Sequence, residues 1–577
     1  MVTEEISDKE KLNSMSEEGE SLKGGTDGTA MSINTAPQQQ PADVGSCATC
    51  SEFAETRCTG CKIVFYCSRD CQKKGWNMHK DSCRPFAISR SKELGKHLIA
   101  SRDLDVDTII VTEAPLVLAP KQVSEPLCLG CYKKVSGDYR CSKCKWPLCS
   151  NECEGKPYHQ MECEVTKKAG VNIIIEDFNK PHPLYELIAP IRCLVTASND
   201  PKKWRICVER YNNRYLQLVG GPQYQHNHTN IVQTLRNTFK IHLDTKLDGS
   251  EASIHTAVGI MQTNHVPTKL PYAELQALFP MASLVSHSCY PNTKSVWNKE
   301  KNCITLQTTD PIKRGQPITA LYTDILWGTR ARREHLRQLR LFTCYCNRCA
   351  DSTELGTYFS ALRCPHCPSP TPVLSVRPLD EEAPWSCTNC SYEVSDEEVI
   401  RINLILGMEV EEALCKPSIP SLEKLKKEWQ KRVHKNHYHL HAVKHSLLQL
   451  YGRAKEKTEE KNEEDYKELE KKEKICKEFL MVCSSLDPST AHTVSYVGLT
   501  FYEYHKTILQ FAKRNFTLSK LTTSQLKKRL LLSKALLKKS MEIFKNEPQD
   551  TPEGQLYNTC MEETIAIGKW MLAVGLV

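Results

Sequence analysis

The spacing of apolar residues changes along the 577-residue chain. From about residue 395 onward, Leu526, Leu530, Leu537, Met541 and Phe544 recur at helical spacing, which predicts amphipathic helices. Prolines divide this part into about five or six helices, and helix pairs of about 30–45 residues without an exact repeat fit a loose solenoid. These prolines are Pro417, Pro420, Pro488, Pro548 and Pro552.

Other patterns fill the rest of the chain. Short apolar runs at 108–112 and 304–307 favour strands. The run 455–477 is dense in Glu and Lys, as on a solvated helix face. Residues 1–45 hold no Phe, Trp, Tyr or Cys, and they carry nine acidic residues against three lysines. Such a segment buries too little apolar surface to fold, so we predict a disordered tail.

Length and composition limit the class of protein. The length predicts about three to five domains. No stretch approaches the ~20 apolar residues of a membrane span, and the chain starts with acidic and polar residues rather than a signal peptide. We therefore expect an intracellular protein without membrane contact, in a compartment that disfavours disulfides. Metal binding is then the usual explanation for its 29 cysteines.

The first cysteine cluster supplies eight ligands at regular spacing. Two C-x2-C pairs are followed by two pairs four residues apart, which share one face of a helix. Eight sulfur and nitrogen ligands fit two tetrahedral Zn²⁺ ions. The ligands are Cys47, Cys50, Cys58, Cys61, Cys67, Cys71, His79 and Cys83.

Two later clusters extend the metal-binding pattern. One repeats the order of ligand types, with a gap before its histidine that is shorter by two residues, and it predicts a second finger with two Zn²⁺ ions. Its ligands are Cys128, Cys131, Cys141, Cys144, Cys149, Cys153, His159 and Cys163. The other cluster, Cys364/Cys367 with Cys387/Cys390, fits a zinc ribbon. Four unpaired cysteines in a loop are the alternative there.

The first cluster resembles the MYND zinc finger, with Phe65-Tyr66 before its fifth ligand and Trp76 before its histidine. In that family the two metals are cross-braced. The resemblance therefore assigns one zinc to Cys47, Cys50, Cys67 and Cys71, and the other to Cys58, Cys61, His79 and Cys83. In the second finger it assigns one zinc to Cys128, Cys131, Cys149 and Cys153, and the other to Cys141, Cys144, His159 and Cys163.

MYND fingers bind proline-rich peptides and rarely read DNA, so the resemblance implies a proline-rich peptide as a partner of the first finger. A module this small has almost no core, and removal of its zinc is expected to unfold it.

Four segments resemble a SET domain in order: the stretch 93–102, Ser286-His-Ser-Cys-Tyr-Pro-Asn292, Pro317-Ile-Thr-Ala-Leu-Tyr322 and Phe342-Thr-Cys-Tyr-Cys-Asn-Arg-Cys349. A MYND finger inside a SET domain is similar to the SMYD family of protein-lysine methyltransferases, over about residues 45–577. The extra N-terminal finger resembles the insect members of that family.

The resemblance implies a multidomain α+β fold, with a zinc-stabilised β-rich SET domain, MYND fingers and a C-terminal α-helical TPR-like domain. The family also implies a monomer in the cytoplasm and nucleus. The expected parts are a tail at 1–45, a MYND-type finger at 46–84, a split SET domain at 85–323 with the second finger inserted at 128–163, a post-SET zinc cluster and zinc ribbon at 324–394, and TPR-like helices at 395–577.

The same resemblance implies S-adenosylmethionine as the cofactor and methyl transfer to a lysine of a histone or another protein. Tyr322 is the implied catalytic residue, which orients the amine close to the sulfonium. The implied cofactor contacts are Gly95, Lys96, His97, Asn264, Ser286, His287, Tyr322 and Phe342. The implied ligands of the post-SET zinc are Cys289, Cys344, Cys346 and Cys349.

Two positions depart from the family pattern. His97 replaces the second glycine of a G-x-G turn, and Ser286 replaces the asparagine of an Asn-His pair. Each lost contact weakens cofactor binding by ~1–3 kcal/mol if it leaves a buried hydrogen-bond partner unpaired, although backbone contacts can survive both changes. The alternative function is therefore a weak or inactive SET protein that acts as a MYND adaptor or transcriptional repressor.

Histidines and net charge invite two further interpretations. The segment 434–441 holds four histidines, but it resembles the start of a family helix rather than a metal site. The formal charge of +8 favours a nucleic-acid partner. However, twenty-two thiolates and six Zn²⁺ ions together lower this charge to about −2. The corrected charge argues against direct DNA binding and leaves only a local basic patch as a basis for it.

Overall fold

The computed structural model describes residues 45–59, 64–211, 215–270, 273–298, 301–452, 463–549 and 551–576. The predicted tail, except its last residue, and part of the run 455–477 lie outside these described residues. The chain divides into two compact units, Met1–His79 and Lys80–Val577.

The first unit contains most of the first finger. Its strands are only two residues long, and its buried residues are few among those described: Cys47, Ala54, Cys58, Tyr66 and His79. So little apolar burial agrees with the expectation that metal stabilises the finger. The elements are β1 (Gly45–Ser46) paired with β2 (Phe53–Ala54), β3 (Thr56–Arg57) paired with β4 (Phe65–Tyr66), and the start of α2 (Arg69–Cys83).

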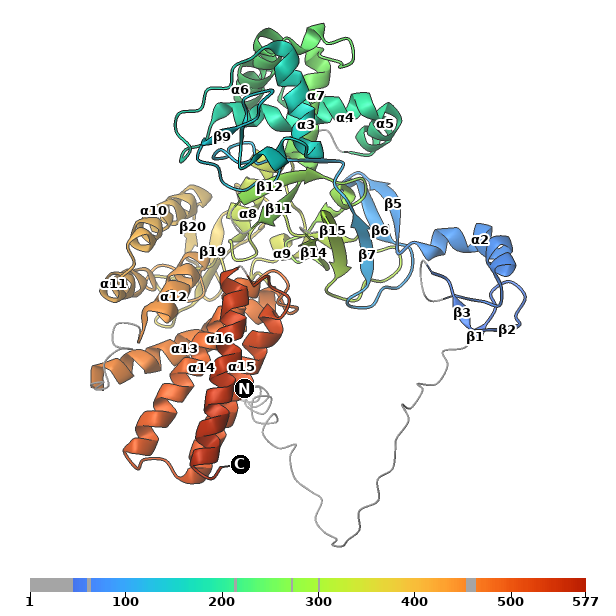
Figure 1. Ribbon diagram of the computed structural model, residues 1–577. Helices are drawn as coiled ribbons and strands as arrows, with labels where there is room; N and C mark the ends of the chain where they lie inside the picture. Colours follow the sequence, from blue (N-terminus) through green and yellow to red (C-terminus); the bar gives the residue numbers. More distant parts are fainter. Residues whose placement is uncertain are drawn as a thin grey trace. The chain divides into compact units, whose positions relative to one another are not determined.

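Small sheets made from distant parts of the chain form the centre of the second unit (Figure 1). One hairpin, two three-stranded sheets and one short parallel pair share a hydrophobic core. The predicted strands at 108–112 and 304–307 are confirmed, and they pair with each other as β7 and β15. The strands are β5 (Phe86–Ser91) with β6 (Gly95–Ala100); β14 (Thr293–Asn298), β15 (Cys303–Thr308) and β7 (Ile109–Glu113); β11 (Val266–Leu270), β12 (Ala273–Leu278) and β8 (Val117–Pro120); and β13 (Ser286–His287) with β16 (Thr319–Ala320).

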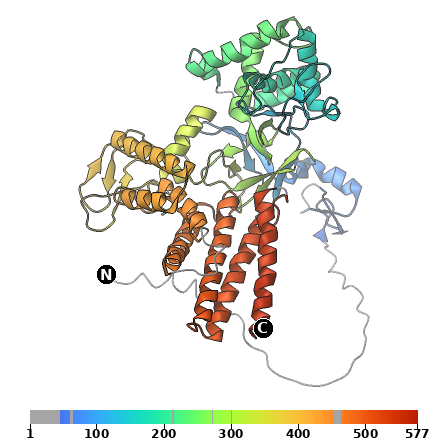
Figure 2. The same ribbon diagram turned by 60° about the vertical axis from the view of Figure 1, so that its left-hand side comes forward.

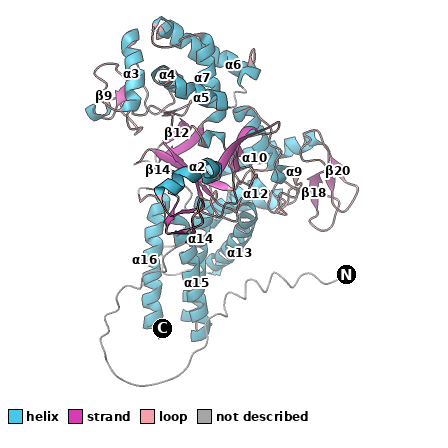
Figure 3. Ribbon diagram, turned by 90° about the vertical axis from the view of Figure 1, so that its right-hand side faces the viewer, coloured by secondary structure: helices cyan, strands magenta, loops and turns pink. Residues whose placement is uncertain are grey.

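A finger and a group of helices are inserted between β8 and β11. Helix α4 packs on β8, and α7 packs on β12, so the insertion and the sheets bury one common core. In Figure 3 strands β12 and β14 lie between the inserted helices and the C-terminal helices. The inserted elements are β9 (Tyr139–Arg140), β10 (Pro147–Leu148), α3 (Pro157–Ala169), α4 (Ile188–Asn199), α5 (Pro201–Arg210), α6 (Pro222–Asn227), the π-helix η5 (His228–Thr238) and α7 (Glu251–Asn264).

After β16 the chain forms short helices and then a four-stranded sheet. The short helices are α8 (Thr329–His335), the π-helical turn η8 (Leu336–Arg340) and α9 (Asn347–Ala350). The sheet contains β17 (Leu362–Arg363), β18 (Pro372–Ser375), β19 (Trp385–Cys387) and β20 (Glu393–Val394).

Helices complete the chain, and the last three lie side by side in Figure 2. The helix predicted from the leucine spacing near residue 530 is confirmed as α15. None of the helices in the described residues is long and apolar enough to cross a membrane. The mixed sheet and helix architecture confirms the predicted fold class. The helices are α10 (Asp396–Cys415), α11 (Ile419–Trp429), α12 (Tyr438–Leu450), α13 (Glu463–Leu486), α14 (Val494–Thr517), α15 (Thr523–Phe544) and α16 (Pro552–Ala573).

Candidate functional site

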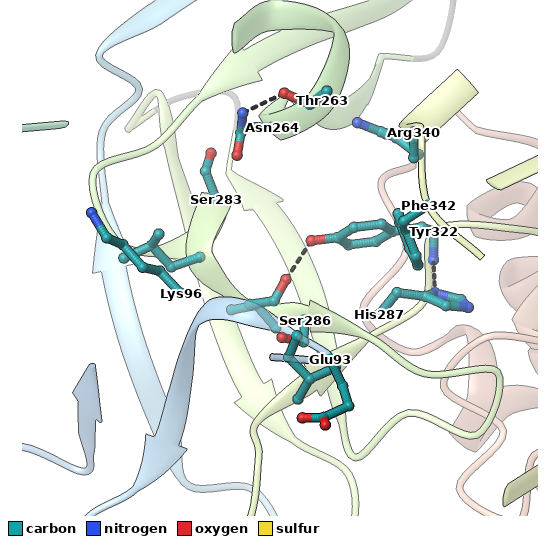
Figure 4. A pocket seen from close by; sticks show the side chains of 13 residues that line it. Glu93, Lys96, Thr263, Asn264, Ser283, Ser286, His287, Tyr322, Arg340 and Phe342 are labelled. Atoms are coloured by element: carbon teal, nitrogen blue, oxygen red, sulfur yellow. Dashed lines mark hydrogen bonds between the residues drawn. The ribbon is translucent and has the colours of Figure 1, made fainter. Parts of the chain in front are cut away.

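A cavity in the second unit brings together residues that are far apart in the sequence (Figure 4). It holds about 540 Å³ of empty space. Six of the eight predicted cofactor contacts line it: Lys96, Asn264, Ser286, His287, Tyr322 and Phe342. The remaining wall is formed by Glu93, Leu94, Thr263, Ser283, Leu284, Val285 and Arg340.

The turn between β5 and β6 forms one wall of the cavity. Gly95 has φ +68°, a left-handed conformation that glycine adopts without strain. The side chain of Lys96 lines the cavity, whereas Gly95 and His97 are not part of the lining. The buried His97 ring instead places its Nδ1 atom 3.0 Å from the carbonyl oxygen of Gly95. The imidazole that replaces the family's second glycine therefore does not narrow the cavity.

Tyr322 and His287 are connected through the backbone. The Nδ1 atom of His287 accepts a hydrogen bond from the Tyr322 backbone N–H at 3.0 Å. Nδ1 is therefore an acceptor, which places the ring proton on Nε2. This Nε2 lies 3.2 Å from the Sγ atom of Cys289. The imidazole thus joins a cysteine of the post-SET cluster to the backbone of the implied catalytic tyrosine.

The Tyr322 hydroxyl reaches across the cavity and donates a hydrogen bond to the carbonyl oxygen of Val285. Burial raises the pKa of Tyr322, and the nearby Arg340 charge offsets this only in part. The phenol is therefore neutral at physiological pH. A neutral hydroxyl can both accept and donate a hydrogen bond, as orientation of an amine requires.

Asn264 and Phe342 complete the predicted contacts. Asn264 is the last residue of α7, and its amide donates to the Thr263 hydroxyl at 2.6 Å. Leu341 adopts a left-handed conformation with φ +57° directly before Phe342, and the Phe342 ring lies 6.1 Å from the ring of His287. An aromatic face and an amide at separate parts of one cavity are suited to a ligand with a flat ring and a polar end.

Sequence reasoning missed several residues of this lining, of which Arg340 and Glu93 carry charge. Glu93 precedes the turn that the sequence did single out, so its position was a usable signal. Arg340 lies two residues before Phe342, but it follows several other arginines in a run without a motif. Nothing in the sequence distinguishes it from its neighbours.

Tyr322 also lines a second cavity of about 1170 Å³. This cavity lies between the segment that follows β16 and the start of α14, so the C-terminal helices form part of it. Its lining residues include Asp324 and the aromatic residues Trp327 and Tyr496. The two cavities thus meet at the implied catalytic residue.

The post-SET cysteines lie directly beside the first cavity. Cys289, Cys344, Cys346 and Cys349 form one four-sulfur group, with the Cys289 sulfur 3.5 Å from Cys349 and 4.0 Å from Cys344. Thiolates around a tetrahedral Zn²⁺ with bonds of about 2.3 Å are separated by roughly 3.8 Å. The donor set and its geometry therefore fit zinc. Tyr322 and Phe342 pack against this group.

The other predicted clusters have the same geometry wherever they are described. Sulfur separations of 3.4–3.8 Å recur in both fingers and the ribbon. Cys61 lies outside the described residues, so the predicted set of Cys58, Cys61, His79 and Cys83 stays a prediction. The assembled groups are Cys47, Cys50, Cys67 and Cys71; Cys128, Cys131, Cys149 and Cys153; Cys141, Cys144, His159 and Cys163; and Cys364, Cys367, Cys387 and Cys390.

A buried ion pair supports the second finger, and sequence reasoning did not find it. The Nδ1 atom of His159 lies 3.1 Å from a carboxylate oxygen of Glu162. Arg192 of α4 donates to both oxygens of this carboxylate, at 2.8 and 2.9 Å. A carboxylate behind a ligating histidine fixes the orientation of the ring. Arg192 also donates to the carbonyl oxygen of Leu118 at 2.5 Å, so it connects the finger to β8.

Comparison with known families identifies two modules. Residues 47–83 match the model of the MYND finger, and residues 95–323 match the model of the SET domain. The crystal structure of the SET domain of LSMT bound to lysine and AdoHcy aligns with 86% of this chain and 92% of that chain at 11% identity. Its TM-score of 0.26 is too low to support a structural argument.

Three curated relatives are 24–26% identical to this chain over 44–59% of its length. The SET domain-containing protein SmydA-8, isoform A, of Drosophila melanogaster is 26% identical over 53% of this chain and 64% of its own length. The histone-lysine N-methyltransferase ASHR1 of Arabidopsis thaliana is 24% identical over 59% of this chain and 70% of its own. The N-lysine methyltransferase SMYD2 of Gallus gallus is 24% identical over 44% of this chain and 57% of its own.

The chain thus spans 57–70% of the lengths of these relatives. It combines a SET domain with a MYND finger, as its matches to both family models show. The chain is therefore a SET- and MYND-domain protein that is similar to proteins of the SMYD type, among them an N-lysine methyltransferase.

Proposed function

We propose that this protein is an S-adenosylmethionine-dependent protein-lysine N-methyltransferase. The observation that carries the proposal is the position of Tyr322, which lines both cavities of the second unit. Methyl transfer needs a cofactor and an amine that approach one point from different sides, because the incoming nitrogen and the departing sulfur lie on opposite sides of the methyl carbon.

The first cavity is the cofactor side in this proposal. S-adenosylmethionine supplies an electrophilic methyl group: the amine lone pair forms the new C–N bond, the C–S bond electrons pass to sulfur, and the amine proton leaves to solvent. Phe342 offers a flat apolar face for the adenine, and Asn264 offers an amide for the polar end. The Tyr322 hydroxyl, held neutral by burial, aligns the amine.

The second cavity is the lysine side. Its aromatic rings, Trp327 and Tyr496, provide the apolar surface on which the lysine methylenes pack. Asp324 adds one carboxylate that attracts the ammonium group as it enters. Burial next to Tyr322 then favours the neutral amine, which is the nucleophile.

Calorimetric titration of the zinc-loaded protein with S-adenosylmethionine tests the proposal first. Measurable binding is expected, and its absence would contradict the proposed enzyme. Tyr322→Phe is then expected to retain cofactor affinity within about twofold and to lose methylation of a protein library by about 10²-fold or more. Turnover equal to that of the parent would show that Tyr322 does not have this role.

A second candidate function, a peptide-binding adaptor, is supported by the first finger. The side chains of Phe53, Trp76 and Met78 are 64, 44 and 91% exposed. Exposed apolar side chains on so small a module are typical of a binding surface. In this function the finger binds proline-rich peptides and the SET domain contributes little catalysis.

A fluorescent proline-rich peptide separates the two candidates. Peptide binding that survives Tyr322→Phe and disappears with Cys58→Ser supports the adaptor function of the finger. If Cys58→Ser leaves the peptide affinity unchanged, the adaptor function is wrong. The two functions are compatible in one chain, and methylation by the parent protein decides whether the SET domain is active.

A further inference from the structure

Arg340 is a buried cation that reaches into the first cavity. It ends the π-helical turn η8, and only 6% of its surface is exposed. One of its terminal nitrogens donates to the carbonyl oxygen of His265 at 2.8 Å. The guanidinium carbon lies 5.2 Å from the centre of the Tyr322 ring. Figure 4 shows its nitrogen pointing across the cavity towards Asn264.

Arg340 differs from the other buried arginines in the described part of the chain, because each of the others contacts a carboxylate. Arg340 has no carboxylate partner among the described residues. A guanidinium keeps its charge at all physiological pH values, and a buried charge without a partner is strongly unfavourable. The paired examples are Arg192 with Glu162 at 2.8 Å, Arg332 with Glu354 at 2.9 Å, Arg348 with Glu354 at 3.2 Å and Arg333 with Glu381 at 3.6 Å.

The groups around Arg340 do not neutralise it. Burial, together with the charge of Arg340, lowers the pKa of His265 to about 3, so this ring is neutral. Burial likewise lowers the pKa of His335. Glu93 lies in a different part of the cavity, as Figure 4 shows, and makes no ion pair with Arg340. The cavity therefore has a fixed cation and space for an anionic group beside it.

We propose that Arg340 binds the carboxylate of the cofactor's amino-acid end. This inference rests on the proposed function, because it takes the cavity to be the cofactor site. A carboxylate is a planar anion that matches the donor fork of a guanidinium. In S-adenosylmethionine the carboxylate is four bonds from the sulfur, so a ligand with its sulfur near Tyr322 reaches Arg340 within the same cavity.

The ion pair also removes an electrostatic conflict at the reaction centre. An uncompensated guanidinium beside Tyr322 repels both the sulfonium and the ammonium group of the incoming lysine. A bound carboxylate cancels this charge before the second cation enters. Arg340 is thus a specificity residue, since it favours nucleosides that carry an amino-acid end over those that lack one.

Calorimetric titration with two nucleosides tests how much the amino-acid end contributes to the affinity. S-adenosylhomocysteine carries the amino-acid end, and 5′-methylthioadenosine has the same adenosine and thioether without it. We expect Arg340→Met to lower the affinity for S-adenosylhomocysteine about 10- to 100-fold and to leave the affinity for 5′-methylthioadenosine unchanged. The matched control is Arg337→Met on the same turn, whose side chain is 48% exposed; it should alter neither affinity.

Arg340→Lys guards against misfolding, because it keeps the charge and most of the volume. Its affinity for S-adenosylhomocysteine should lie between those of the parent and Arg340→Met, with an unchanged zinc content. An equal loss for both nucleosides, or no loss, would overturn the role of Arg340 while the proposed function stands. An effect of Arg340→Met that is confined to the KM of an acidic substrate peptide would also overturn the role of Arg340. Failure of the parent to bind either nucleoside would overturn the proposed function, and this inference with it.

Discussion

Single residues behind the zinc ligands decide how firmly the second finger is held. His159 contacts Glu162, and Glu162 is paired with Arg192 in a fully buried arrangement. Neither charge reaches solvent, so each depends on the other for stabilisation. The pair therefore links metal binding in the finger to the packing of α4 against β8.

Glu162→Gln tests this link. It leaves the Arg192 guanidinium buried without a carboxylate, and we expect a loss of about 3–5 kcal/mol in the free energy of unfolding. Zinc affinity should fall about 10- to 100-fold as the His159 ring loses its partner. Urea unfolding and competition with a chromogenic chelator measure the two effects. The control is Glu125→Gln in the exposed pair with Lys134, which should change stability by less than about 1 kcal/mol; equal effects would show that burial of the pair does not matter.

Residue-level prediction from the sequence succeeded where a motif surrounds the residue. Most predicted cofactor contacts line one cavity, because segments such as that around His287 carry a recognisable order of residues. His97 is different: it was chosen for its place in the turn, yet its side chain is not in the lining. Arg340 and Glu162 were missed because their roles depend on burial and on partners contributed by other elements, which the sequence of one chain does not reveal.

The histidines in α12 and in the segment just before it show how burial sets the charge of an imidazole. His434, His439 and His445 each have a pKa lowered to about 4, with burial as the main cause. All three are therefore neutral at pH 7. His445 accepts a hydrogen bond from Gln449 on Nδ1 at 3.2 Å, and its other ring nitrogen is buried. These three histidines thus contribute neutral rings to the packing in and around α12.

These histidines predict a loss of stability in acid. An unfolded histidine titrates near 6.5, above its folded pKa of about 4, so the unfolded state binds more protons between these values. The contribution of His445 is present above pH 6.5 and is lost as the pH falls towards 4, by up to about 3 kcal/mol. His445→Gln should flatten the pH dependence of urea unfolding in this window, whereas the exposed His242→Gln should not. If the free energy of unfolding of His445→Gln changes with pH in parallel with that of the parent, this explanation is wrong.

Prediction of whole elements was reliable for segments with periodic apolar residues. It was less reliable for the exposure of charge-rich segments. The spacing of Leu526 and Leu530 was sufficient to predict α15. The Glu/Lys-rich run was expected to form a solvated face, and its described part belongs to α13. However, Lys472 in that run is buried and pairs with Glu503. A charged residue can be buried when a neighbouring helix supplies its partner, and composition does not show that partner.

At the scale of the molecule, metal sites hold together parts that the chain separates. The post-SET group joins Cys289 to three cysteines about 55–60 residues later, and Tyr322 and Phe342 pack on it. The ribbon cysteines belong to a different hydrophobic core, with the first C-terminal helices. Zinc in the first group therefore stabilises the candidate active site, whereas zinc in the ribbon stabilises a remote region.

Two cysteine variants test this division. Cys289→Ser and Cys387→Ser should each lose about one zinc ion from a parent total of about six. Cys289→Ser should also lower the affinity for S-adenosylhomocysteine at least about tenfold, because Tyr322 and Phe342 no longer pack against an intact zinc site. Cys387→Ser should keep that affinity within about twofold, because the ribbon shares no residue with the cavity. Elemental analysis gives the metal count, and calorimetry gives the affinity. A measured total of about four zinc ions or fewer in the parent protein would contradict at least two of the predicted sites. Equal affinities for S-adenosylhomocysteine in both variants would show that the post-SET metal does not stabilise the cavity.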